Sequence, residues 1–210
     1  IDMLSHHYKP VALIFLAILL SSCAGVSGSM PIRYYLIDPA ESLNTIHKSS
    51  KPLSIEIISL HIPQYLDRFH IATRKSESRL EFSENHQWGE NLRKNLLRTM
   101  SRNLSALLST IDIGTPLNRS SSPPDYRVKI HIEQFEQESN KKVKLVARWQ
   151  LLGGPESKAL GIFNANLQGQ NTIEKNNFEQ MVSVMRQLFG TLSQRVAKTI
   201  IAQENNFQPR

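Results

Sequence analysis

The sequence predicts an α+β domain: a mainly antiparallel sheet with two long amphipathic helices packed on one face. Two stretches repeat apolar residues every three or four positions, the period of a helix, and three later runs alternate apolar with polar residues, the period of a half-buried strand. A sheet that carries both helices on one face buries every apolar stripe. The first helical stripe comprises Trp88, Leu92, Leu96, Met100, Leu104 and Leu108.

The N-terminus has the pattern of a secretion signal. Residues 1–22 are predicted to be a signal peptide that is removed, with the true start at Met3. A short basic stretch ends at Lys9, and Val11 to Leu20 is an unbroken apolar run. Such a run rises only about 15 Å as a helix, too little to cross a bilayer core of roughly 30 Å.

Cys23 follows this signal directly and is the predicted site of lipidation. Leu20-Ser21-Ser22-Cys23 has the form of a lipobox, in which small residues precede the cut and the thiol accepts the diacylglycerol. The alternative, a buried or disulfide-bonded cysteine, is disfavoured because the chain has no second cysteine. The lipid on Cys23 is therefore the only bound group that we expect, with no metal and no cofactor.

The residue after the cysteine bears on location. Ala24 stands where an Asp tends to retain lipoproteins at the inner membrane, so we expect the periplasmic face of the outer membrane in a Gram-negative bacterium. Residues 23–32 form a lipidated, flexible tether rich in Gly and Ser. Ala24 to Pro31 spans at most about 25–30 Å, which keeps the domain close to the bilayer.

The first half of the domain is predicted to form strands followed by a helix. We expect strands at 33–37 and 54–62, the second bounded by Pro52 and Pro63, and two short strands at 70–73 and 79–82. A long helix follows over roughly 84–111, with Ser83 as its N-cap and a stop at Gly114 and Pro116.

The second half is predicted to form an antiparallel meander and a second helix. Strands are expected at 126–133, 143–151 and 163–167. Apolar residues from Phe178 to Ile200 mark the helix. The whole of 33–203 is predicted to be one α+β domain, and 204–210 a polar, disordered tail.

A search for chemistry finds no catalytic residue and no metal ligand set. Phosphate-binding loops, His/Cys metal spacings and nucleophile motifs are missing from the sequence. The net charge of +7 suits either plain solvation or an acidic partner such as anionic lipid, and a periplasmic address excludes nucleic acid. The basic side chains gather on the polar face of the 126–133 strand and near it: Arg127, Lys129, His131, Lys141, Lys142, Lys144 and Arg148.

A run in the first half resembles a known family. Ile62-Pro63-Gln64-Tyr65-Leu66-Asp67-Arg68, then Ile71, Arg74, Trp88 and Leu92, resembles the PqiC/YmbA family of ABC-transport auxiliary lipoproteins, as does the early Tyr-Tyr-Leu-Ile-Asp-Pro at 34–39. The family often has Gly-Pro before this segment, where this chain has Ser59-Leu60-His61.

The resemblance implies a role beside MCE proteins, the periplasmic assemblies that carry lipids between the two membranes. In this role the chain is not an enzyme but an accessory component that docks the transport assembly to the outer membrane. An MCE-domain protein is the implied partner, and phospholipid and a second copy of the chain are further candidates. The implied partner-binding residues are Tyr65, Asp67, Arg68 and Arg74.

The sequence also allows two other functions. One is an envelope lipoprotein enzyme, such as a hydrolase acting on lipid or cell wall, although no motif supplies its nucleophile. The other is a purely structural lipoprotein of an envelope assembly, which would depend on a partner without any defect in lipid transport.

Overall fold

The computed structural model describes residues 30–41, 43–46, 52–116, 118, 123–154 and 156–207. The chain divides into two compact units, Ile1–Pro31 and Ile32–Arg210, and the helices and strands that the structure describes all belong to the second. The signal peptide, Cys23, most of the tether and residues 208–210 of the tail lie outside the described residues.

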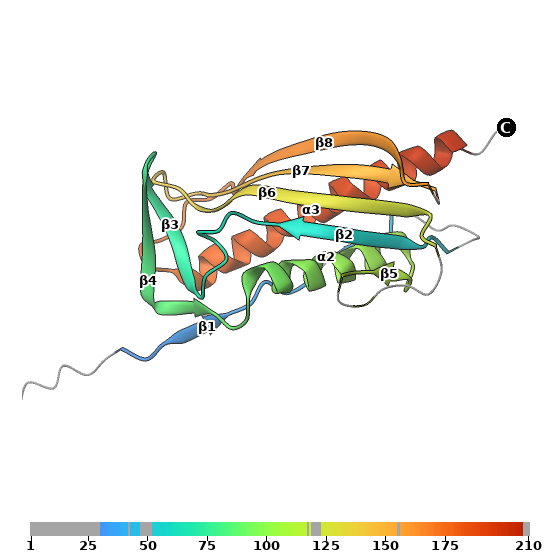
Figure 1. The fold of residues 1–210 in the computed structure, drawn as a ribbon. Helices are drawn as coiled ribbons and strands as arrows, with labels where there is room; N and C mark the ends of the chain where they lie inside the picture. The colour runs from blue at the N-terminus through green and yellow to red at the C-terminus, as the bar shows by residue number, and fades with distance from the viewer. Residues whose placement is uncertain are drawn as a thin grey trace, which may run out of the picture. The chain divides into compact units, whose positions relative to one another are not determined.

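The second unit contains one sheet and two helices (Figure 1). In chain order the elements are β1 (Arg33–Tyr35), β2 (Ile55–His61), β3 (His70–Ser76), β4 (Arg79–Trp88), α2 (Leu92–Leu108), β5 (Ile113–Gly114), β6 (Tyr126–Gln137), β7 (Val143–Gly153), β8 (Lys158–Gln168) and α3 (Phe178–Phe207).

The sheet is mixed, so the prediction of a mainly antiparallel sheet is wrong. The predicted meander is present, because β7 pairs antiparallel with both β6 and β8. However, β2 runs parallel to both β5 and β6, and β1 runs parallel to β4. Parallel neighbours need a long crossover. The chain supplies one between β2 and β6, where the β3–β4 hairpin and α2 intervene.

Both helices cover one face of the sheet, as predicted (Figure 1). The hydrophobic core lies between the helices and that face of the sheet. On β6, Val128, Ile130 and Ile132 are buried, while Lys129 on the opposite face is exposed. Because side chains alternate along a strand, this pattern shows that one face is covered and the other is open. Apolar stripes of α2 and α3, with Met100 and Phe189 among them, fill the covered side.

The first helix is shorter than predicted. Residues 84–88 belong to β4, whose end is held on both sides: Tyr35 of β1 pairs with Trp88, and Trp88 N donates to Phe69 O at 2.7 Å. Helix α2 therefore begins only at Leu92, with Asn91 as its N-cap in place of Ser83. It ends at Leu108, where Ser109 adopts a left-handed conformation, and not at residue 111.

The second helix is longer than predicted. We expected 204–210 to be a disordered tail, but α3 continues through residues 204–207 to Phe207.

A strap, residues 36–41 and 43–46, follows β1 and runs along α2. Buried polar side chains, spaced one turn apart on α2, hold the strap. On the side of α2 that faces the strap, they take the place of the apolar residues that usually fill a buried helix face. Asn95 Oδ1 accepts from Ile37 N at 2.8 Å, and Thr99 Oγ1 donates to Ile37 O at 2.6 Å. Further along, Ile46 N donates to Leu107 O at 2.9 Å. The strap thus crosses most of the length of α2.

A bulge near the end of β6 reverses which side chains face the core. The register shifts between Ile132 and Gln134 opposite β7. After the shift Phe135 faces the core, where its ring stacks 6.2 Å from that of Phe189. Glu136 consequently points to the opposite side of the sheet, where the predicted site residues lie.

Candidate functional site

Three of the four residues that we predicted to bind the partner lie in the turn between β2 and β3, residues 62–69, and the fourth, Arg74, lies within β3. Two backbone hydrogen bonds close this turn, from Leu66 N to Pro63 O at 2.9 Å and from Asp67 N to Gln64 O at 3.2 Å. The side chain of Leu66 is buried in the core. The turn is therefore fixed to the domain.

Tyr65 and Arg74 meet at the buried carboxylate of Glu136, whose side chain is 0% exposed. Tyr65 OH donates to Glu136 Oε2 at 2.9 Å, and Arg74 Nε donates to Glu136 Oε1 at 2.8 Å. Gln134 Nε2 adds a bond to Oε1 at 3.1 Å, and Phe135 N donates to Oε2 at 3.0 Å. We call Tyr65, Arg74, Gln134 and Glu136 the Glu136 cluster. A buried charge is tolerated when it is paired and hydrogen-bonded, as it is here.

The cluster changes how its members titrate. Burial, followed by the nearby charge of Glu136, raises the pKa of Tyr65 above its usual value of 10.0. Burial alone would lower the pKa of Arg74, but the hydrogen bond and charge of Glu136 outweigh it and raise that pKa. Tyr65 therefore keeps its proton and stays a hydrogen-bond donor. The arrangement joins the turn, β3 and β6 through one carboxylate.

Asp67 makes a separate set of contacts at the start of α2. Its Oδ1 accepts from Asn91 Nδ2 at 2.6 Å, and its Oδ2 lies 3.7 Å from Arg93 Nε. The Oδ1 of Asn91 in turn caps the helix by accepting from Lys94 N at 3.1 Å. Asp67 thus orients the N-cap and places a negative charge near the positive end of the helix dipole.

Arg68 is the predicted site residue most available to a partner. Arg68 is exposed. Its guanidinium carbon lies 5.2 Å from the centre of the Phe82 ring, which makes a cation–π contact with β4. The structure therefore brings Tyr65 and Arg74 together, ties Asp67 to α2 and leaves Arg68 on the surface of the hairpin.

Glu136, the centre of the cluster, was not foreseen from the sequence. The signal that could have found it is the break in alternation after Ile132, because the next core residue, Phe135, follows three positions later and not two. Such a break indicates a bulge that turns the following polar residue to the other face.

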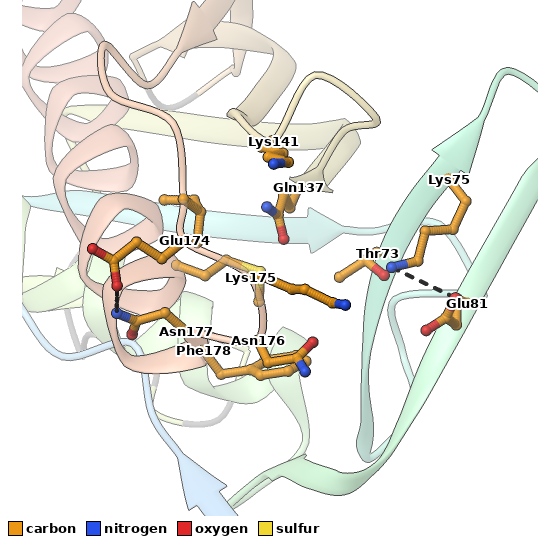
Figure 2. A pocket seen from close by; sticks show the side chains of 12 residues that line it. Thr73, Lys75, Glu81, Gln137, Lys141, Glu174, Lys175, Asn176, Asn177 and Phe178 are labelled. Carbon is orange, nitrogen blue, oxygen red and sulfur yellow. Dashed lines mark hydrogen bonds and ion pairs between the residues drawn. The ribbon is translucent and has the colours of Figure 1, made fainter.

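A cavity of about 270 Å³ lies on the other side of the same hairpin, between β3, β4, the end of β6 and the start of α3 (Figure 2). Lys75, Lys141 and Lys175 line it, and Lys175 extends into it in the close view. Two glutamates offset these charges. Glu81 Oε2 lies 3.5 Å from Lys75 Nζ, and Glu174 Oε2 accepts from Asn177 Nδ2 at 3.5 Å. The cavity has room for a small polar ligand, with a small excess of positive charge.

Three of the seven basic residues that we noted on or near the open face of the sheet form ion pairs with carboxylates. The ion pairs are Arg127 with Glu56 at 3.1 Å, Arg148 with Glu133 at 3.5 Å, and Lys144 with Glu138 at 3.4 Å. Plain solvation with local charge neutralisation accounts for these three residues.

Within the described residues, no group of three or more His, Cys, Asp or Glu side chains is placed to hold a metal ion. Neither of the two helices that the structure describes is long and apolar enough to cross a membrane.

The fold and the site define an α+β domain in which the Glu136 cluster braces the β3–β4 hairpin and Asp67 braces the start of α2. Residues 34–197 match the model of a family described as the ABC-type transport auxiliary lipoprotein component, and the chain belongs to that family. No curated protein matches the sequence.

Two solved structures share the fold. One is an uncharacterized protein, 16% identical with a TM-score of 0.62, covering 81% of this chain and 99% of its own. The other, from Xanthomonas campestris and assigned to DUF330, is 11% identical with a TM-score of 0.62, covering 86% of this chain and 99% of its own. At this level of identity they support the fold alone.

Proposed function

We propose that this lipoprotein is an accessory component of an MCE-type transport system and docks the transport assembly to the outer membrane from the periplasmic side. Membership of the auxiliary lipoprotein family is the observation that carries the proposal. Cys23, the single cysteine, stands just before the matched region and carries the covalent diacylglycerol anchor. Anchoring to a membrane raises the effective concentration at the partner, so the protein interface can be weak.

We further propose that the turn 62–69 meets the partner through Arg68. Tyr65, Asp67 and Arg74 were predicted beside it, and their side chains have internal partners in Glu136 and Asn91. Their role at the interface is to hold the turn in place, whereas the exposed guanidinium of Arg68 is free to contact an acidic or polar surface of the MCE protein.

Affinity capture of the tagged protein from detergent-solubilised envelopes, followed by mass spectrometry, tests both parts. We expect the wild type to recover an MCE-domain protein. Arg68→Ala should recover at least about tenfold less, corresponding to the roughly 1.4 kcal/mol of a modest interface contact. Arg102→Ala, which removes an exposed arginine of α2 far along the helix from the turn, is the matched control and should recover the normal amount.

The outcomes separate the two parts of the proposal. Recovery of no MCE-domain protein by the wild type contradicts the transport role and returns the envelope hydrolase and the purely structural lipoprotein as the alternatives. Normal recovery by Arg68→Ala, with normal thermal unfolding, contradicts only the assignment of the interface.

A further inference from the structure

The strand β1 carries a row of exposed apolar side chains. It pairs with β4 on one side, with Tyr35 opposite Trp88, and lies at the edge of the sheet. Tyr35 turns inward, because its hydroxyl bonds to His86 Nδ1 at 2.8 Å. Side chains alternate along an extended chain, so Ile32, Tyr34 and Leu36 project to the other side, where they are 45%, 65% and 42% exposed.

A fourth exposed apolar residue lies at the same end of the domain. Phe69 is 61% exposed, and its carbonyl oxygen accepts from Trp88 N at 2.7 Å, next to the point where β1 pairs with β4. The exposed Arg33 stands between Ile32 and Tyr34 in the chain, and its side chain leaves β1 on the opposite side, that of Tyr35. Apolar and aromatic side chains next to a cation are typical of surfaces that rest in the headgroup region of an anionic bilayer.

The position of the row in the chain identifies its occupant. The inference rests on the proposed lipid at Cys23, which eight residues, Ala24 to Pro31, separate from Ile32. Those residues reach at most about 25–30 Å, so the row is the first part of the domain that the anchored chain brings to the bilayer. By contrast, α2 extends away from the β1 end of the domain (Figure 1). It has 17 residues, which makes it about 25 Å long, and Ile111, which is 100% exposed, comes three residues after its last residue.

We propose that Ile32, Tyr34 and Leu36 insert into the headgroup region of the membrane that carries the lipid anchor. The contact fixes the orientation of the domain. The β1 end faces the bilayer, and the turn 62–69 lies next to the bilayer surface, where a partner that delivers or collects lipid would be met. Two attachments, acyl chains and an interfacial strand, hold the domain more firmly than the acyl chains alone.

Single-cysteine labelling of the full mature lipoprotein tests this contact directly. The thiol of Cys23 is consumed by the lipid, so an introduced cysteine is the only free thiol. Tyr34→Cys and the matched control Ile111→Cys are each labelled with the fluorophore NBD and reconstituted in vesicles of phosphatidylethanolamine and phosphatidylglycerol. Quenching by lipids that carry a doxyl group on the acyl chain then reports whether the label enters the bilayer.

We expect strong quenching and a blue-shifted emission at position 34, and emission typical of water at position 111. Equal, water-like emission at both positions in protein that floats with the vesicles overturns the membrane contact while leaving the anchor intact. Protein that fails to float overturns the anchor and the contact together. Shielding at position 34 that appears only when the captured MCE protein is added would assign the row to a protein interface and also overturn the proposal.

Discussion

At the scale of single residues, the carboxylate of Glu136 decides how the β3–β4 hairpin is held to the rest of the domain. Its partners come from three places in the chain: the turn 62–69, β3 and β6 itself. A buried ion pair is weak evidence of net stability, because desolvation costs nearly as much as the pair gains. Removing one partner is different, since it leaves a charge buried without compensation.

Arg74→Ala should therefore lower the free energy of unfolding by about 3–5 kcal/mol, measured by urea denaturation at neutral pH. Arg93→Ala is the matched control, because Arg93 is 48% exposed and lies 3.7 Å from Asp67. An exposed pair of this kind contributes about 1 kcal/mol or less. Equal effects of the two substitutions would show that Glu136 does not depend on Arg74.

Tyr65 gives the cluster a pH signature at alkaline pH. The pKa of Tyr65 is raised in the fold, above the value near 10 of the unfolded chain. The resulting stability is fully present below pH 10 and is lost as the pH rises further, because the unfolded state releases the proton first. The free energies of unfolding of wild type and Tyr65→Phe should therefore differ by about 1–3 kcal/mol at pH 8. This difference should shrink as the pH is raised to 11. Parallel curves would contradict a protonated Tyr65 held by Glu136.

At the scale of elements, the strap joins the N-terminal side of the domain to both helices. Its hydrogen bonds to Asn95 and Thr99 fix it along α2. At Ala40 it also meets α3: a Cβ atom added to Gly190 would lie 2.8 Å from the Cβ of Ala40. Gly190 is thus required by the close approach of the strap and not by the helix, which would prefer alanine.

Gly190→Ala should fail to give the gain of about 1 kcal/mol that alanine normally brings to a helix, and should instead lower the melting temperature. The double variant Gly190→Ala with Ala40→Gly removes the opposing methyl group and should recover most of the loss. If Gly190→Ala alone stabilises the protein, the strap does not pack on α3 as described.

The elements also show what periodicity can and cannot predict. The meander β6–β7–β8 and both amphipathic helices follow from alternation and helical period, because burial against one core imposes those patterns. The start of α2 was misplaced because Trp88 fits a helical stripe equally well as a strand end, and only its pairing with β1 and Phe69 decides between them. Parallel pairing of β2 with β6 is set by the α2 crossover, which no local pattern records.

The site was predictable to a similar degree. The family resemblance led to the turn 62–69, and the structure places Tyr65 and Arg74 in one network. Their common partner Glu136 lies 62 residues or more further along the chain. Contacts at such separations depend on the register of β6 and its bulge, so the resemblance pointed to these residues but could not predict what they contact.

At the scale of the whole molecule, we propose a membrane anchor at Cys23 and a protein contact at the turn 62–69. Among the described residues, hydrogen bonds tie the strap to α2 and join the turn to β3 and β6 through Glu136. We propose that the domain, held by its lipid, keeps an MCE-type assembly at the outer membrane.

The most direct test follows the MCE-domain protein itself in separated inner and outer membranes, from cells that carry wild type or Cys23→Ala. With wild type, part of the MCE-domain protein should sediment with the outer membrane together with the lipoprotein. With Cys23→Ala, both should be lost from that fraction while the MCE-domain protein remains in the inner membrane. An MCE-domain protein distributed identically in the two strains, or a wild-type lipoprotein found only in the inner membrane, would contradict docking of an MCE-type assembly at the outer membrane by this lipoprotein.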